Sequence, residues 1–161
     1  MAGDARAPQR IEPVLDGTGV RVAVVAGRFN DQVTFRLLDG VERGLRAVGA
    51  PEPIVEWVPG AFEIPLAAKV FAASGKVDAV IGLGCVIRGA TTHYEAVAGE
   101  SAAGILRAGL ATGVPVIFGV LTTENLDQAL ERSEGPGGHN VGEEGAQTAV
   151  EMVRLLERIR A

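Results

Sequence analysis

The chain has 161 residues, of which 47% are hydrophobic, and this length is typical of one folded domain with one core. Its 20 acidic residues outnumber its 15 basic residues, so it lacks the broad positive field with which proteins hold a nucleic-acid backbone. The longest apolar run, residues 77–87, is far shorter than the ~20 residues that cross a bilayer. We therefore expect neither a nucleic acid nor a membrane as partner.

The beginning of the chain and its single cysteine bear on location. Residues 1–13 contain no continuous apolar stretch, so they lack the hydrophobic region of a secretory signal. Cys85 lies in an apolar run and has no second cysteine for an intrachain disulfide, which fits a reducing compartment. We expect a cytoplasmic protein with Cys85 in its core, an N-terminal arm over residues 1–18 and one domain over residues 19–161.

Apolar runs typical of buried strands alternate with segments whose apolar residues recur at helical spacing. The predicted strands are residues 20–26, 54–58, 79–87 and 114–121, and the predicted helices are residues 30–49, 64–73, 92–112, those after 123, and 143–160. This order predicts an α/β fold, a three-layer αβα sandwich around a four-stranded parallel sheet. Residues 134–142, which are rich in glycine, are predicted to form a loop.

A parallel sheet binds ligands outside the carboxyl ends of its strands, so the segments after the strands are the place to look for chemistry. After the third strand comes the sequence Arg-Gly-Ala-Thr-Thr-His, residues 88–93. Its small residues leave backbone N–H groups open where a helix dipole favours an anion, although Thr91 or Thr92 could simply cap the helix. His93 stands beside this phosphate-sized site and can exchange protons near neutral pH. We therefore predict an enzyme that handles a phosphorylated substrate.

Three further side chains are candidates, each with a plainer alternative. Phe29 follows the first strand and can stack on a planar ligand or fill the core. Glu63 can accept hydrogen bonds from a ligand or complement the dipole of the helix that follows it. Arg132 can bind a phosphate as a forked donor or remain a solvated charge.

Several cofactor motifs are absent from the sequence. Ile87 occupies the third glycine position of a dinucleotide fingerprint, and neither a Walker motif nor a nucleophile elbow occurs. The sequence His-Tyr-Glu at residues 93–95 lacks the paired cysteines of a zinc deaminase. We expect no metal, and chemistry that depends on proton transfer and positioning.

Taken in order, four segments resemble the lumazine synthase family of riboflavin biosynthesis: residues 27–30 (GRFN), 58–65 (VPGAFEIP), 86–93 (VIRGATTH) and 118–125 (FGVLTTEN). The resemblance extends roughly from residue 11 to the end. It implies a flavodoxin-like fold and a transferase that needs no cofactor. The implied reaction condenses 5-amino-6-(D-ribitylamino)uracil with 3,4-dihydroxy-2-butanone 4-phosphate to 6,7-dimethyl-8-ribityllumazine, phosphate and water.

The resemblance also implies roles for individual residues. Carried over by position, His93 shuttles protons during imine formation and elimination, and Phe29 stacks on the pyrimidine. The residues that it implies for substrate binding are Phe29, Asn30, Gly60, Ala61, Phe62, Glu63, Val86, Ile87, Arg88, Gly89, Ala90, Thr91, Phe118, Arg132 and Val141.

In the family the site lies between adjacent subunits of a homopentamer, so the resemblance implies that Phe118 and Arg132 come from the neighbour. Pentamers of the family also occur as decamers or 60-subunit shells, and the N-terminal arm is expected to pair with a neighbouring subunit.

Val141 departs from the family pattern, since it stands where a lysine commonly contacts the pyrimidine. We therefore expect a site that depends more on stacking and on Glu63. Two alternatives remain at this point: a non-catalytic, ligand-binding or shell-forming relative, and a sugar-phosphate isomerase.

Overall fold

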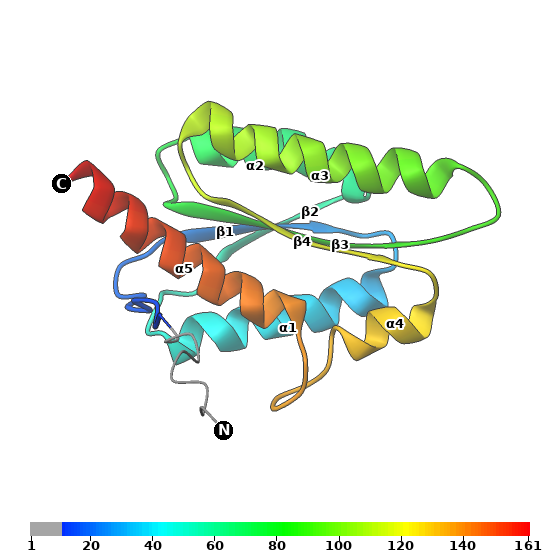
Figure 1. The fold of residues 1–161 in the computed structure, drawn as a ribbon, viewed down its shortest axis with the longest axis horizontal. Helices are drawn as coiled ribbons and strands as arrows, with labels where there is room; N and C mark the ends of the chain where they lie inside the picture. The colour runs from blue at the N-terminus through cyan, green and yellow to red at the C-terminus, as the bar shows by residue number, and fades with distance from the viewer. Residues whose placement is uncertain (1–10) are drawn as a thin grey trace, which may run out of the picture.

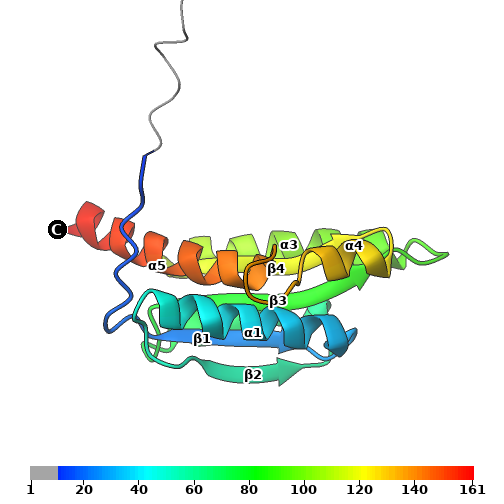
Figure 2. The same cartoon turned by 90° about the horizontal axis from the view of Figure 1, so that it is seen from below.

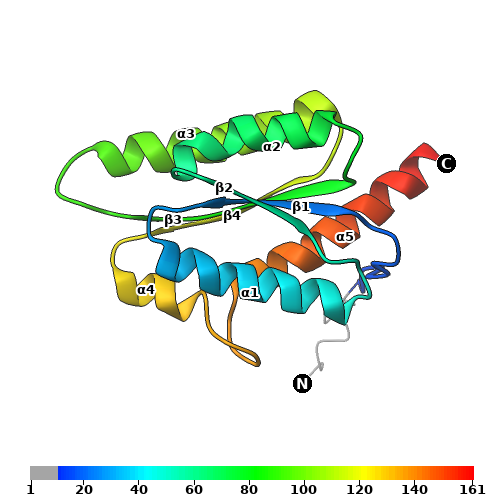
Figure 3. The same ribbon diagram turned by 180° about the vertical axis from the view of Figure 1, so that it is seen from behind.

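The computed structural model describes residues 11–161, in which two layers of helices enclose one parallel sheet (Figure 1). The strands are β1 (Val22–Gly27), β2 (Ile54–Val58), β3 (Ala79–Ile87) and β4 (Val116–Thr123), in the order β2-β1-β3-β4. One face is covered by α2 (Ile64–Ala73) and α3 (His93–Thr112), and the other by α1 (Asp31–Ala47), α4 (Leu126–Glu131) and α5 (Val141–Arg160), as Figures 1 and 3 show. The predicted three-layer, flavodoxin-like α/β fold is confirmed.

The central strands have apolar residues on both faces because each face meets a helical layer. In β1, Val22 and Val24 pack in the core under α1 and α5, whereas Ala23 and Val25 pack in the core under α2 and α3. A strand buried on both faces needs an unbroken apolar sequence rather than an alternating one. This explains why β1 and β3 stand out so clearly in the sequence.

The boundaries of β2 and β3 agree with the prediction, and those of β1 and β4 are shifted toward the C-terminus. β1 begins at Val22 because the backbone N–H of Arg21 donates to the Asp78 carboxylate instead of a strand neighbour, at 2.8 Å. β4 ends at Thr123, two residues later than predicted, because its pairing with β3 continues as far as Ile87. In both cases the hydrogen-bonding partner of the strand determines where the strand begins or ends.

Helix α5 begins at Val141, before the predicted start at residue 143, because Asn140 fixes its first turn. The Asn140 side chain is buried, and its Oδ1 accepts from the N–H of Glu143 at 3.1 Å. Its Nδ2 donates to the carbonyl oxygens of Arg36 at 3.1 Å and Glu134 at 2.9 Å. Asn140 therefore ties α1, the loop over residues 134–140 and the start of α5 together.

The chain enters the domain through a segment that leads away from its body (Figure 2). Ile11 is 93% exposed, and the described part of the predicted arm, residues 11–18, contains no strand. The first ten residues of that arm lie outside the described residues. Arg154 of α5 donates to the carbonyl oxygens of Asp16 and Thr18, each at 2.7 Å, and so fixes the point where the segment joins the domain. Over residues 11–161, no helix is long and apolar enough to span a membrane.

Candidate active site

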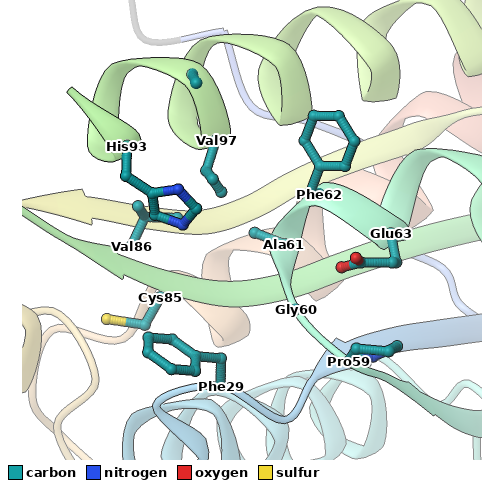
Figure 4. Close-up of a pocket in the computed structure, with 11 residues that line it drawn as sticks. Phe29, Pro59, Gly60, Ala61, Phe62, Glu63, Cys85, Val86, His93 and Val97 are labelled. Carbon is teal, nitrogen blue, oxygen red and sulfur yellow. The ribbon is translucent and has the colours of Figure 1, made fainter. Parts of the chain in front are cut away.

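A cavity of about 450 Å³ lies at the carboxyl ends of β1, β2 and β3 (Figure 4). The order of the strands reverses between β1 and β3, and the crevice at such a reversal is the usual ligand site of an open parallel sheet. The cavity brings together seven of the residues that the sequence implicated. They are Phe29, Gly60, Ala61, Phe62, Glu63, Val86 and His93.

Phe29 lies in the turn after β1, and hydrogen bonds to the neighbouring strands fix this turn. The N–H of Phe29 donates to the carbonyl of Pro59 at 3.1 Å, which ties the turn to the segment after β2. Asn30 adopts a left-handed conformation, with φ of 61°, and its Nδ2 donates to the carbonyl of Cys85 at 2.8 Å. Phe29 is 74% exposed, so its alternative as a core residue is wrong for this chain, and its ring is available to a ligand.

Glu63 lies on the side of the cavity formed by the short 3-10 helix η1 (Ala61–Glu63). It occupies the N-cap position of α2, but its side chain makes no capping hydrogen bond. Figure 4 shows its carboxylate, the His93 imidazole and the Phe29 ring around one space. A carboxylate in this place can accept hydrogen bonds from the hydroxyl groups of a bound molecule.

The connection between β3 and α3 keeps its backbone donors unused. Within residues 11–161, none of the N–H groups of residues 89–92 donates to another protein atom. These residues are exposed, and nothing lies within 4 Å of the position that a Gly89 side chain would occupy. Free N–H groups before a helix form a site suited to an anion.

His93 begins α3 directly after this connection and points into the cavity (Figure 4). Its N–H donates to the Thr91 hydroxyl oxygen at 3.3 Å, and Thr92, at the N-cap, makes no side-chain capping bond. Of the two threonines that could cap the helix, Thr91 therefore binds its first N–H group and Thr92 does not. The arrangement places an imidazole beside a row of free backbone N–H groups and opposite an aromatic ring.

Sequence comparison places the chain among known proteins. Residues 19–157 match the sequence model of the family 6,7-dimethyl-8-ribityllumazine synthase. The chain belongs to this family. Two relatives named 6,7-dimethyl-8-ribityllumazine synthase, from two strains of Thermus thermophilus, are each 51% identical over 154 residues, which cover 94% of this chain and 98% of theirs.

Three residues of the implied lumazine synthase site, Phe118, Arg132 and Val141, lie away from the cavity within one chain. Phe118 of β4 is 43% exposed, and together with Val141 it lines a separate hollow of about 300 Å³ beside α5. Arg132 is the C-cap residue of α4, and its guanidinium donates to the carbonyl of Gln128 at 2.9 Å and lies 3.7 Å from the carboxylate of Glu131. None of the three lines the cavity that contains His93.

Four lining residues were not predicted as site residues: Pro59, Cys85, Ala96 and Val97. Ala96 and Val97 lie one turn after His93 on α3, so the helical period could have indicated them. Cys85 gave the opposite signal, because a cysteine inside an apolar strand is typical of a core residue. It is indeed buried, at 3% exposure, and it also borders the cavity.

The reactivity of Cys85 provides a test of its placement. Burial raises the pKa of its thiol to about 11, and only the thiolate reacts with alkylating reagents. At pH 8 we expect iodoacetamide to modify the folded protein about 100-fold more slowly than the guanidinium-unfolded protein, as followed by mass spectrometry. Equal rates in the two states would contradict a buried Cys85.

Proposed function

We propose that this cavity condenses 5-amino-6-(D-ribitylamino)uracil with 3,4-dihydroxy-2-butanone 4-phosphate to give 6,7-dimethyl-8-ribityllumazine, phosphate and water. As a member of its family, the chain is a lumazine synthase, an enzyme of riboflavin biosynthesis. The observation that carries the assignment of this cavity is the position of His93, between the free N–H groups of residues 89–92 and the exposed ring of Phe29.

The proposed reaction needs protons to be moved several times near one place. The amine attacks the ketone and water leaves to give an imine, phosphate is then eliminated, and ring closure releases a second water. His93 carries protons in these steps, since its imidazole can both donate and accept near neutral pH. Gly89, Ala90 and Thr91 bind the phosphate through their free N–H groups.

The uracil substrate is assigned to the opposite side of the cavity. Phe29 stacks on the pyrimidine, while Ala61, Phe62 and Glu63 hold the ribityl chain. Gly60 and Val86 line the cavity between the two substrates, whereas the Ile87 side chain packs against the core under α1 and α5. Asn30 supports Phe29 through its bond to the end of β3. With Val141 in place of lysine, the uracil substrate depends more on stacking against Phe29 and on the hold of Glu63 on its ribityl chain.

The site is proposed to be completed by a second copy of this chain, in a homopentamer. Phe118, Arg132 and Val141 do not reach the cavity of their own chain, and in the proposed pentamer they serve the cavity of a neighbour. Small and apolar residues on α3, all exposed except the half-buried Ala103, follow the three-four spacing with which helices pack against helices. They are Ala96, Gly99, Ala103, Leu106 and Leu110.

Two parts of the proposal concern the chain as a whole. The described part of the arm, residues 11–18, pairs with a neighbouring subunit, and the exposed Ile11 and Val14 supply apolar side chains for it. A cytoplasmic location fits Cys85, because a reducing compartment preserves a free thiol.

Activity is tested by incubating the full-length protein with both substrates and following the lumazine by its fluorescence. We expect product well above the spontaneous rate and none when either substrate is omitted. Product formation no faster than without protein would leave only a non-catalytic relative. Conversion of the phosphorylated substrate in the absence of the amine would instead support the isomerase.

Replacing Arg132 with alanine tests whether this side chain binds the phosphate of a substrate in the neighbouring subunit's cavity. The loss of a charge-assisted hydrogen bond of about 1.5–3 kcal/mol is expected to raise KM for the ketose phosphate about 10- to 100-fold. KM for the uracil substrate should change little. Arg158→Ala, which removes an exposed arginine in the last turn of α5, is the matched control. An unchanged KM in Arg132→Ala would remove Arg132 from the phosphate site.

A further inference from the structure

Arg88 makes an unusual set of contacts directly beside the proposed phosphate site. Its Nε donates to the Glu124 carboxylate at 2.8 Å, and its Nη1 donates to the Glu95 carboxylate. Its guanidinium carbon lies 4.2 Å from the centre of the Tyr94 ring, within the range of a cation–π interaction. One side chain at the end of β3 thus contacts the beginning of α3 and the segment after β4.

These contacts face away from the cavity. His93 and Val97 line the cavity, whereas Arg88, Tyr94 and Glu95 do not. Side chains two residues apart on an α-helix point in directions that differ by about 200°. A helix that directs His93 toward the cavity therefore directs Glu95 to the opposite side. Arg88 therefore holds the side of α3 that lies opposite the substrates.

No other side chain among residues 11–161 hydrogen-bonds the first turn of α3 to the segment after β4. Within residues 11–161, the loop between, residues 89–92, donates no backbone hydrogen bond to protein, and its acceptors Thr91 and Thr92 bind only N–H groups of α3. Arg88 itself is anchored, since its N–H donates to the carbonyl of Thr123 at 2.8 Å. The geometry of the loop thus depends on the two ends that Arg88 joins.

The charges around Arg88 also disfavour an anion at its guanidinium. Hydrogen bonding to Arg88 holds the pKa of Glu95 below its ordinary value, so this carboxylate is charged at neutral pH. Two carboxylates surround one guanidinium, which leaves a net negative charge in the cluster of Arg88, Glu95 and Glu124. A phosphate that approached this guanidinium would meet both carboxylates.

We propose that Arg88 is a positioning residue, which holds the start of α3 so that residues 89–92 and His93 face the phosphorylated substrate, and that it does not bind the phosphate. This inference rests on the proposed function. It revises the role that the family resemblance implies for Arg88 and assigns functions to Glu95 and Glu124, which that resemblance does not include.

Glu95→Gln separates positioning from direct binding, because the two roles predict opposite effects. If Arg88 bound the phosphate, Glu95→Gln would free its guanidinium and remove a negative charge, so phosphate would bind more tightly. We call the ion pair between Arg88 and Glu95 the brace. If Arg88 positions α3, Glu95→Gln and Arg88→Gln both weaken this brace, and both variants lose function. The measurements are kcat, KM for the ketose phosphate, and the dissociation constant of inorganic phosphate, all with the full-length protein.

We expect Arg88→Gln and Glu95→Gln each to lower kcat/KM for the ketose phosphate about 10-fold, with weaker binding of inorganic phosphate in both. In the double variant, kcat/KM should fall about 10-fold and not 100-fold, because both substitutions remove the same interaction. Arg88→Lys, which keeps the charge and one hydrogen bond, should recover part of the loss. Arg21→Gln is the matched control, because it removes a guanidinium paired with Asp78 at the amino ends of the strands.

Tighter binding of inorganic phosphate in Glu95→Gln, together with weaker binding in Arg88→Gln, would overturn the proposal in favour of a direct ligand. Wild-type values in both variants would overturn it as well. If the wild-type protein made no lumazine, the proposed function would fail, and binding of inorganic phosphate would still test the brace. Should Arg88→Gln not fold, Glu95→Gln and Arg88→Lys carry the same comparison.

Discussion

Replacement of His93 with alanine is expected to lower kcat by about 100- to 10,000-fold, the usual cost of removing a group that transfers protons in the transition state. The fold should be unaffected, because the imidazole is exposed at the start of α3 and makes no hydrogen bond to any of residues 11–161. The measurement is the initial rate of lumazine formation with both substrates at saturation, beside a circular dichroism spectrum of each protein.

The chain supplies its own control for this experiment. His139, the second of its two histidines, lies in the loop before α5 and contacts the carboxylate of Glu144 at 3.1 Å. It does not line the cavity of its own chain and has no assigned role in the shared site, so His139→Ala should leave kcat within about twofold of the wild-type value. A His93→Ala enzyme that turned over at the wild-type rate would show that positioning alone supplies the acceleration.

Substitution of Gly142 by alanine is expected to cause a large loss of stability, of about 3 kcal/mol or more, which corresponds to a melting temperature about 6–12 °C lower. A methyl group at Gly142 would overlap the carbonyl oxygen of Leu37 in α1. A backbone atom cannot rotate away as a side chain can, so α1 and α5 would have to separate. The free energy of unfolding in urea, at fixed protein concentration, measures the effect.

Gly145→Ala, one turn later in the same helix, is the matched substitution. A methyl group there would lie 3.6 Å from the nearest side-chain atom, on Ile117, which is ordinary van der Waals contact. Because alanine favours a helix over glycine by about 1 kcal/mol, this variant should be as stable as the wild type or slightly more stable. Similar losses in both variants would mean that close packing at Gly142 is not the cause.

The same glycine shows why the start of α5 was predicted two residues late. Glycine is a poor helix former, so Gly142 after Asn140 resembled the end of a loop. In the structure, Asn140 caps the helix, and Gly142 is the residue that permits close contact with α1. Contacts between distant parts of the chain outweigh local preference here, and such contacts cannot be read from a single sequence.

The candidate site was predictable where it depends on the ends of strands. Phe29, Glu63 and His93 follow three different strands, and a parallel sheet brings such segments to one edge. The contacts of Arg88 were not predictable, since Glu95 and Glu124 read as ordinary surface charges until β3, α3 and β4 are placed side by side. The lining role of Cys85 was hidden for a related reason, because sequence cannot tell a buried strand residue from one that borders a cavity.

The separation of the His93 cavity from the hollow of Phe118 and Val141 has a thermodynamic consequence under the proposed shared site. A substrate that contacts two chains at once binds the assembled form more tightly than the separate chains. Linkage then requires the reverse, so that the substrate favours association by the same free energy by which association strengthens its binding. Dilution of the enzyme and depletion of its substrate would therefore both shift the association equilibrium toward separate chains.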